Sequence, residues 1–72
     1  MDPHVEKIVQ AILAYLERNP QAADTAEGIE RWWLRGTQDH SAGLVARALE
    51  ILVARGDIER VRSAHGIVFR RR

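Results

Sequence analysis

Three helix-stopping signals most constrain what this chain can fold into. Asn19-Pro20, Gly36 and Gly56 interrupt an otherwise apolar-rich pattern. Proline moves the residue before it out of the helical region, and glycine readily takes the left-handed conformation that ends a helix. The stops therefore divide the chain into three helix-length segments, followed by a last segment in which apolar and charged residues alternate.

The first segment has the pattern of an amphipathic helix. Its apolar residues recur at spacings of three and four, which places them on one stripe: Val5, Ile8, Val9, Ile12, Leu13 and Leu16. Asp2 can cap the start of this helix, and Pro3 suits its first turn. We predict a helix over about 3–18.

Two further helices are predicted from their ends. Asp24 in "DTAE" can cap a second helix over about 25–35, with Glu27 reaching back as in a capping box. A third helix, over about 41–55, follows a short polar link, and Asp39 or Ser41 can cap it. Apolar residues occupy most of its circumference, which leaves for the exposed side Gly43, Ala46, Arg47, Glu50 and Ala54.

The last segment has the pattern of a β-hairpin over about 58–71. Its turn "SAHG" suits a type I turn, because serine is favoured at the first position and glycine at the last. A left-handed Gly66 would make this the common three-residue loop with a bulge. In that register, the residue numbers of two paired residues add up to 130, as for Val61 and Phe69.

This register would separate apolar from charged side chains. Val61 would face Phe69 and Arg60 would face Arg70, so one face would carry Val61, Ile67 and Phe69 and the other Arg60, Arg62, Arg70 and Arg72. A shift by one would pair Glu59 with Arg70 and scatter the apolar residues. Like charges directly opposite one another are destabilising, so the preferred register indicates an anion that compensates. We expect Ile58, Val61, Ile67 and Phe69 to close the core.

The composition indicates one small domain without a metal or cofactor. Seventy-two residues leave room for one domain, and the absence of cysteine excludes disulfides, iron–sulfur clusters and thiolate zinc sites. His4, His40 and His65 match no zinc spacing. No catalytic constellation or glycine-rich phosphate loop is found, so we expect a protein that is not an enzyme.

The apolar runs are far shorter than the roughly 20 residues that span a bilayer. No signal-peptide pattern opens the sequence, and the absence of cysteine fits a reducing compartment. We therefore expect a cytoplasmic protein that is not bound to a membrane.

The net charge of +1 conceals an asymmetry along the chain. Residues 1–54 carry five basic and eight acidic side chains, a net of −3. Residues 55–72 carry six arginines and two acidic side chains, a net of +4. Such an arrangement can produce a local positive field on a nearly neutral protein.

The predicted order of helix, helix–turn–helix and β-hairpin resembles the winged-helix variant of the helix-turn-helix fold. The stretch "SAGLVARALEILVARGDIERV" looks like the third helix and first wing strand of many winged-helix domains. The resemblance covers essentially the whole chain at the level of architecture. It implies a mainly α fold in a single domain, 1–72, with three helices followed by a two-stranded wing.

The resemblance also implies a DNA-binding surface. In winged helices that bind DNA, the third helix enters the major groove and the wing contacts the flanking backbone or minor groove. Gln38, Ser41 and Arg47 would then approach the groove. Phosphate contacts would come from the wing arginines, namely Arg60, Arg62, Arg70, Arg71 and Arg72. We expect duplex DNA as the partner, and a role in transcription regulation.

A protein partner is the alternative, because winged helices are also reused as adaptors within larger assemblies. The exposed side of the third helix is nearly neutral, and Trp32 and Trp33 stand side by side in the second helix. Adjacent helical residues point about 100° apart, so either both tryptophans flank the core or one is exposed. An exposed tryptophan would suit an anchor for a protein partner or for a second copy in a homodimer.

Overall fold

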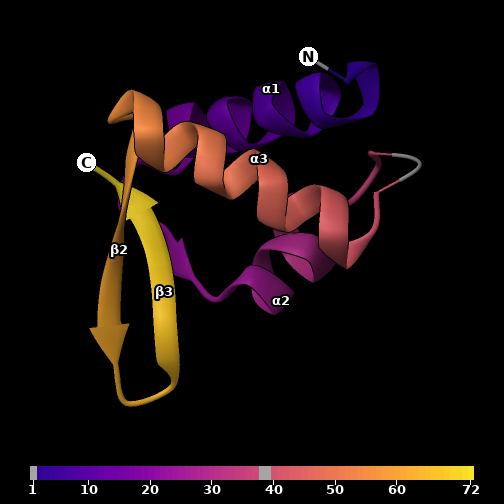
Figure 1. Cartoon of the computed structure of the whole chain (residues 1–72). Helices are drawn as coiled ribbons and strands as arrows, with labels where there is room; N and C mark the ends of the chain where they lie inside the picture. Colours follow the sequence, from indigo (N-terminus) through magenta and orange to yellow (C-terminus); the bar gives the residue numbers. More distant parts are fainter. Residues whose placement is uncertain (1, 38–39) are drawn as a thin grey trace.

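The computed structural model describes residues 2–37 and 40–72, which form helices packed on a small antiparallel sheet (Figure 1). The elements in chain order are α1 (Pro3–Arg18), β1 (Ala23–Asp24), α2 (Ala26–Gly28), η1 (Ile29–Trp33), α3 (Ala42–Arg55), β2 (Ile58–Ser63) and β3 (Gly66–Arg71). This layout is compatible with a winged helix.

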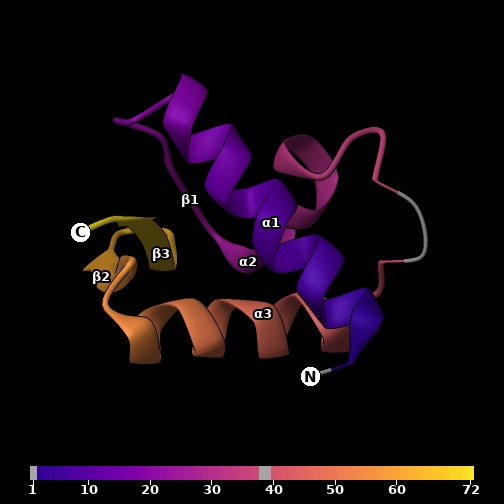
Figure 2. The ribbon, with the colours of Figure 1, turned by 90° about the horizontal axis from the view of Figure 1, so that it is seen from above.

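Helix α1 has the bounds that its apolar stripe predicts. The Asp2 side chain accepts a hydrogen bond from the His4 backbone N–H at 2.7 Å, and Pro3 occupies the first turn. At the other end, the backbone N–H of Asn19 donates to the Tyr15 carbonyl at 2.8 Å. Figure 2 shows α1 running obliquely to α3, against which it packs.

The second helical segment begins one residue later than its predicted cap. The Thr25 hydroxyl accepts from the Gly28 backbone N–H at 3.2 Å, and Thr25 is therefore the N-cap of α2. Asp24 instead accepts from the Thr25 backbone N–H at 2.8 Å. The prediction of Asp24 as the cap was wrong because Asp24 belongs to the short strand β1.

The second helix then widens into a π-helical turn, η1, that contains both tryptophans. The Leu34 backbone N–H donates to the Ile29 carbonyl, five residues earlier, at 3.2 Å. Apolar periodicity predicts a helix over this range but does not distinguish a π-turn from an ordinary α-helical turn.

Helix α3 begins and ends where its sequence signals predict. The Ser41 hydroxyl accepts from the Leu44 backbone N–H at 3.3 Å, which makes Ser41 the N-cap. Gly56 ends the helix with φ 83°, a left-handed conformation that glycine adopts without steric cost.

The sheet has three strands in the order β1-β3-β2, where the sequence predicted a two-stranded wing. The additional strand, β1, has only two residues, and two residues are too few for the alternation that identifies a strand. Strand β1 pairs with β3 through Ala23 opposite Arg70 and Asp24 opposite Phe69. Strand β3 therefore lies in the middle of the sheet.

The predicted register of the β2–β3 hairpin was wrong by one residue. Gly66 has the expected positive φ, 100°, but Ser63 pairs with Gly66 and the loop contains only Ala64 and His65. Arg60 then lies opposite Phe69, and Glu59 opposite Arg70. The observed register therefore replaces the repulsive pair of Arg60 and Arg70 with the attractive pair of Glu59 and Arg70.

The observed register also directs Ile58 and Phe69 toward the helices, since both lie on the same face of the hairpin. Val61 is only half-buried, and Ile67 is exposed, so the expectation that these two residues close the core was wrong. The core is otherwise built from the predicted helical stripes. Its buried members are Val5, Ile8, Val9, Ile12, Leu16, Ile29, Trp33, Leu34, Val45, Ala48, Leu49, Leu52, Ile58 and Phe69.

Within residues 2–37 and 40–72, no helix has the length and apolar character needed to cross a lipid bilayer.

Candidate interaction surface

The arginines of the hairpin lie on both of its faces. Arg60 and Arg62 share one face with Phe69, whereas Arg70 lies on the other face, opposite Glu59. Arg70 Nε donates to Glu59 Oε2 at 2.7 Å. The prediction that the arginines form a single outward-facing row was therefore wrong, because it depended on the other register.

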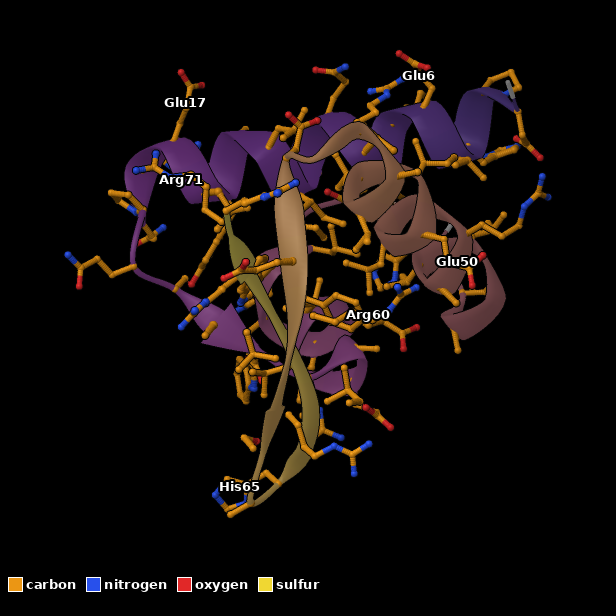
Figure 3. The ribbon with its side chains drawn as sticks, turned by 60° about the vertical axis from the view of Figure 1, so that its left-hand side comes forward. Glu6, Glu17, Glu50, Arg60, His65 and Arg71 are labelled. Carbon is orange, nitrogen blue, oxygen red and sulfur yellow. The ribbon has the colours of Figure 1, made fainter. Side chains whose placement is uncertain are left out.

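Two further arginines lie near α1, at the end of the hairpin distant from the turn. Figure 3 shows Arg71 level with α1 and Arg60 projecting toward α3. Arg71 and Arg72 line a shallow surface hollow together with Glu17 of α1 and Asp57. The Arg72 backbone N–H also donates to the Asp57 carbonyl at 3.2 Å. Arg71 lies opposite Ile58 in the β2–β3 ladder, so these two arginines are at the end of the hairpin where α3 ends, distant from the turn.

The exposed side of α3 has the small, nearly neutral character expected from the sequence. Arg47 and Glu50 are its exposed charged residues in the middle of the helix, and neither forms an ion pair with another described residue. The Ser41 hydroxyl is engaged as the helix cap. Gln38, the remaining residue predicted to approach a groove in DNA, lies outside the described residues.

A groove of about 500 Å³ separates α3 from β3, and the start of α2 forms its third wall. We call it the α3–β3 groove. Its apolar lining comes from all three walls and consists of Ala26, Ala46, Leu49, Ile67 and Phe69. Ile67 is 41% exposed and therefore contributes accessible apolar surface to the groove.

The polar lining of the α3–β3 groove contains charges of both signs. Glu27 of α2 lines the groove. Glu50 lines it from α3 and Arg60 from β2, and both are labelled in Figure 3. Among the described residues, these three side chains form no ion pair with one another. Thr25, His65 and Gly66 complete the lining.

The two adjacent tryptophans have different environments. Trp33 is 6% exposed, and its ring stacks on Tyr15 with centroids 4.7 Å apart and planes 10° apart. Trp32 is 54% exposed. Of the two arrangements that the sequence left open, the one with a single exposed indole is found.

The described part of the chain offers no evident metal site. It contains no group of three or more histidine, cysteine, aspartate or glutamate side chains placed to hold an ion. His40 lies with Nδ1 3.6 Å from Glu30 Oε2, which makes a two-residue contact and not a metal centre.

The apolar and charge patterns of the sequence do not place Ile67, Glu27 and Glu50 in one site. The spacing of two residues between Ile58 and Arg60 does indicate where Arg60 lies. Alternate residues of a strand share a face, so a strand that directs Ile58 toward the helices directs Arg60 to the same face. This alternation would have placed Arg60 beside α3.

No protein-family model, curated protein or solved structure matches this chain at the level required for significance. The site is therefore interpreted from its own geometry.

Proposed function

We propose that this chain is a non-enzymatic binding module of the winged-helix type whose partner is a protein. The observation that carries the proposal is the indole of Trp32, which is 54% exposed beside the buried Trp33. Leaving such a large apolar surface in water is unfavourable by roughly 25 cal/mol per Å². Tryptophan is also among the residues most enriched at the centres of protein interfaces.

The local backbone supports the same proposal. Trp32 lies within the π-helical turn η1, and π-turns occur frequently at functional sites. Because Trp33 is stacked on Tyr15, the turn is anchored on its inner side. The exposed indole is thus held on a fixed part of the fold, which reduces the ordering cost of binding.

Duplex DNA is the second candidate partner. Arg60 and Arg62 share the hairpin face that carries the lining of the α3–β3 groove, and Arg47 is exposed on α3. Three cations on this side of the molecule favour phosphate. Glu27 and Glu50 line the groove on the same side and would oppose it. We therefore rank a protein partner first.

Site-specific photocrosslinking tests the proposal. A photoreactive phenylalanine analogue replaces Trp32 in the full chain, in the cells that make the protein, and adducts are identified by mass spectrometry. The matched control carries the same group at Gln10, which is exposed on α1. We expect a discrete protein adduct, with another protein or a second copy, from position 32 and not from position 10. Equal labelling at both positions would contradict the proposal.

A titration with a labelled mixed-sequence duplex distinguishes the second candidate. At two salt concentrations, we expect weak binding that Arg60→Ala with Arg62→Ala changes little. Tight binding that falls steeply with salt and is lost in this double variant would instead favour DNA, because each released phosphate contact lowers the salt dependence.

A further inference from the structure

The edge of β3 that faces α2 is only partly covered by a strand. Strand β2 pairs with β3 from Gly66 to Arg71, whereas β1 covers only Phe69 and Arg70 on the other side. After Asp24 the chain turns into α2, so no described strand follows β1 along residues 66–68 of β3. An uncovered strand edge presents backbone donors and acceptors that an extended chain can pair with.

The α3–β3 groove reaches this edge and extends from it over the sheet face that carries Arg60, Ile67 and Phe69. Gly66 and Ile67 line it from β3, and Thr25 and Ala26 line it where the chain leaves β1. A strand added beside residues 66–68 would therefore continue the line of β1 and occupy the groove. Its side chains on one face would reach the apolar lining, including the exposed Ile67.

The charges of the groove select the chemistry of such a strand. Glu27 and Glu50 face the groove from two helices, against the single cation Arg60. None of the three is engaged in an ion pair among the described residues. Because the groove has two carboxylates and one guanidinium, it favours a bound strand that carries a basic side chain near its apolar side chain.

We propose that the α3–β3 groove binds an extended segment of a partner protein, in which an apolar residue is followed two positions later by lysine or arginine. The spacing of two follows because alternate residues of a strand point to the same face. The apolar side chain packs on Ile67 and Leu49, and the basic side chain reaches Glu27 and Glu50. This inference rests on the proposed function, since it takes the partner to be a protein.

A library of random twelve-residue peptides displayed on phage, selected against the full chain, tests the inference. We expect enriched peptides to share an apolar residue and, two positions later, lysine or arginine. Ile67→Lys should weaken a selected peptide about tenfold or more, because it removes the apolar contact and adds a like charge. Enriched peptides without a basic residue, or unchanged binding to Ile67→Lys, would overturn the inference.

Charge reversal provides the specificity test. In Glu27→Lys with Glu50→Lys, selection should yield aspartate or glutamate in place of lysine or arginine. The matched control is Glu6→Lys with Glu17→Lys, which makes the same charge change on α1, outside the groove (Figure 3). Glu6 and Glu27 each lie in the first turn of a helix, so the cost to the helix dipole is similar in the two variants. A preference that both double variants change equally would show a general charge effect and overturn the inference.

The test also separates this inference from the proposed function. Trp32 does not line the groove, so crosslinking at position 32 has an independent outcome. If no peptide binds while position 32 still crosslinks a protein, the groove inference fails and the proposed function stands. Competition of a selected peptide by an unlabelled duplex, lost in Arg60→Ala with Arg62→Ala, would assign the groove to DNA and overturn the inference.

Discussion

Arg70 Nε lies 2.7 Å from Glu59 Oε2, and the two residues are direct partners across the β2–β3 ladder. The contact holds the hairpin in a register that splits its arginines between two faces. Both side chains are more than a third exposed, so their attraction is screened by solvent. The pair fits the observed register and is expected to contribute little to overall stability.

A double-mutant cycle should detect this pair. Glu59→Gln combined with Arg70→Gln is expected to give a coupling energy of about 0.2–1 kcal/mol, smaller at high salt. Urea unfolding at two salt concentrations measures it. In the same protein, nuclear Overhauser contacts should join Val61 to Val68 across the strands. Contacts that place Val61 directly opposite Phe69 would contradict the register.

Substitution of the two adjacent tryptophans should change the free energy of unfolding by very different amounts. Trp33→Ala removes a buried ring stacked on Tyr15 and is expected to lower the free energy of unfolding by about 3–5 kcal/mol. Trp32→Ala should change it by no more than about 0.5 kcal/mol, since the side chain is largely exposed. Urea unfolding followed by circular dichroism compares the two. Equal losses would show that Trp32 is part of the core.

Gly28 should tolerate no side chain while Asp24 keeps its position. A Cβ at Gly28 would overlap the Asp24 carboxylate, which accepts a hydrogen bond from the Thr25 backbone N–H. We expect Gly28→Ala to destabilise the fold by no more than about 1 kcal/mol, because the Asp24 carboxylate can turn away at the cost of its hydrogen bond to Thr25, while alanine has the higher helix propensity.

The Asp24→Ala background is the control for Gly28. There the carboxylate is absent, and adding Gly28→Ala should be neutral or stabilising. Thermal unfolding of the four proteins measures the difference. A loss of the same size in both backgrounds would show that the conflict does not involve Asp24.

Gly43, inside α3, and Gly56, at its C-cap, form a matched pair. Gly56 has φ 83°, so Gly56→Ala should cost about 1–2 kcal/mol. Gly43 is helical and exposed, with open space around its Cβ position, so Gly43→Ala should stabilise by up to about 1 kcal/mol. Chemical denaturation of both variants provides the comparison, and effects of the same sign would contradict it.

The helices could be predicted from the sequence because their signals are redundant. α1 has a stripe, a cap and a proline stop that agree, and α3 has a cap and a left-handed glycine. The hairpin register depends on the balance of two weaker preferences. Placing Val61 with Phe69 favoured one register, while burying Ile58 and pairing Glu59 with Arg70 favoured the other. The second register is found. Strand β2 contacts α3, and Ile58 is 2% exposed, so this register buries a large apolar side chain that the helices contact.

The candidate site was harder to predict because it also depends on the register of the hairpin. Its groove combines α2, α3 and β3, and a shift of one residue decides whether Arg60 lies on the same face as Ile67 and Phe69 or on the opposite face. Strand β1, which leaves part of the β3 edge uncovered, is too short to show periodicity. Trp32 lies in the π-turn, and the apolar pattern specifies neither this turn nor which of the two tryptophans is exposed.

The central place of β3 has a consequence for biosynthesis. The ribosome makes the middle strand of this sheet last of the three, at roughly 5–20 residues per second. Until residues 66–71 have left the exit tunnel, β1 and β2 have no neighbour to pair with, and the pocket that Phe69 fills is open to water. The helices of the nascent chain therefore cannot complete their core until β3 is available to pair with β1 and β2.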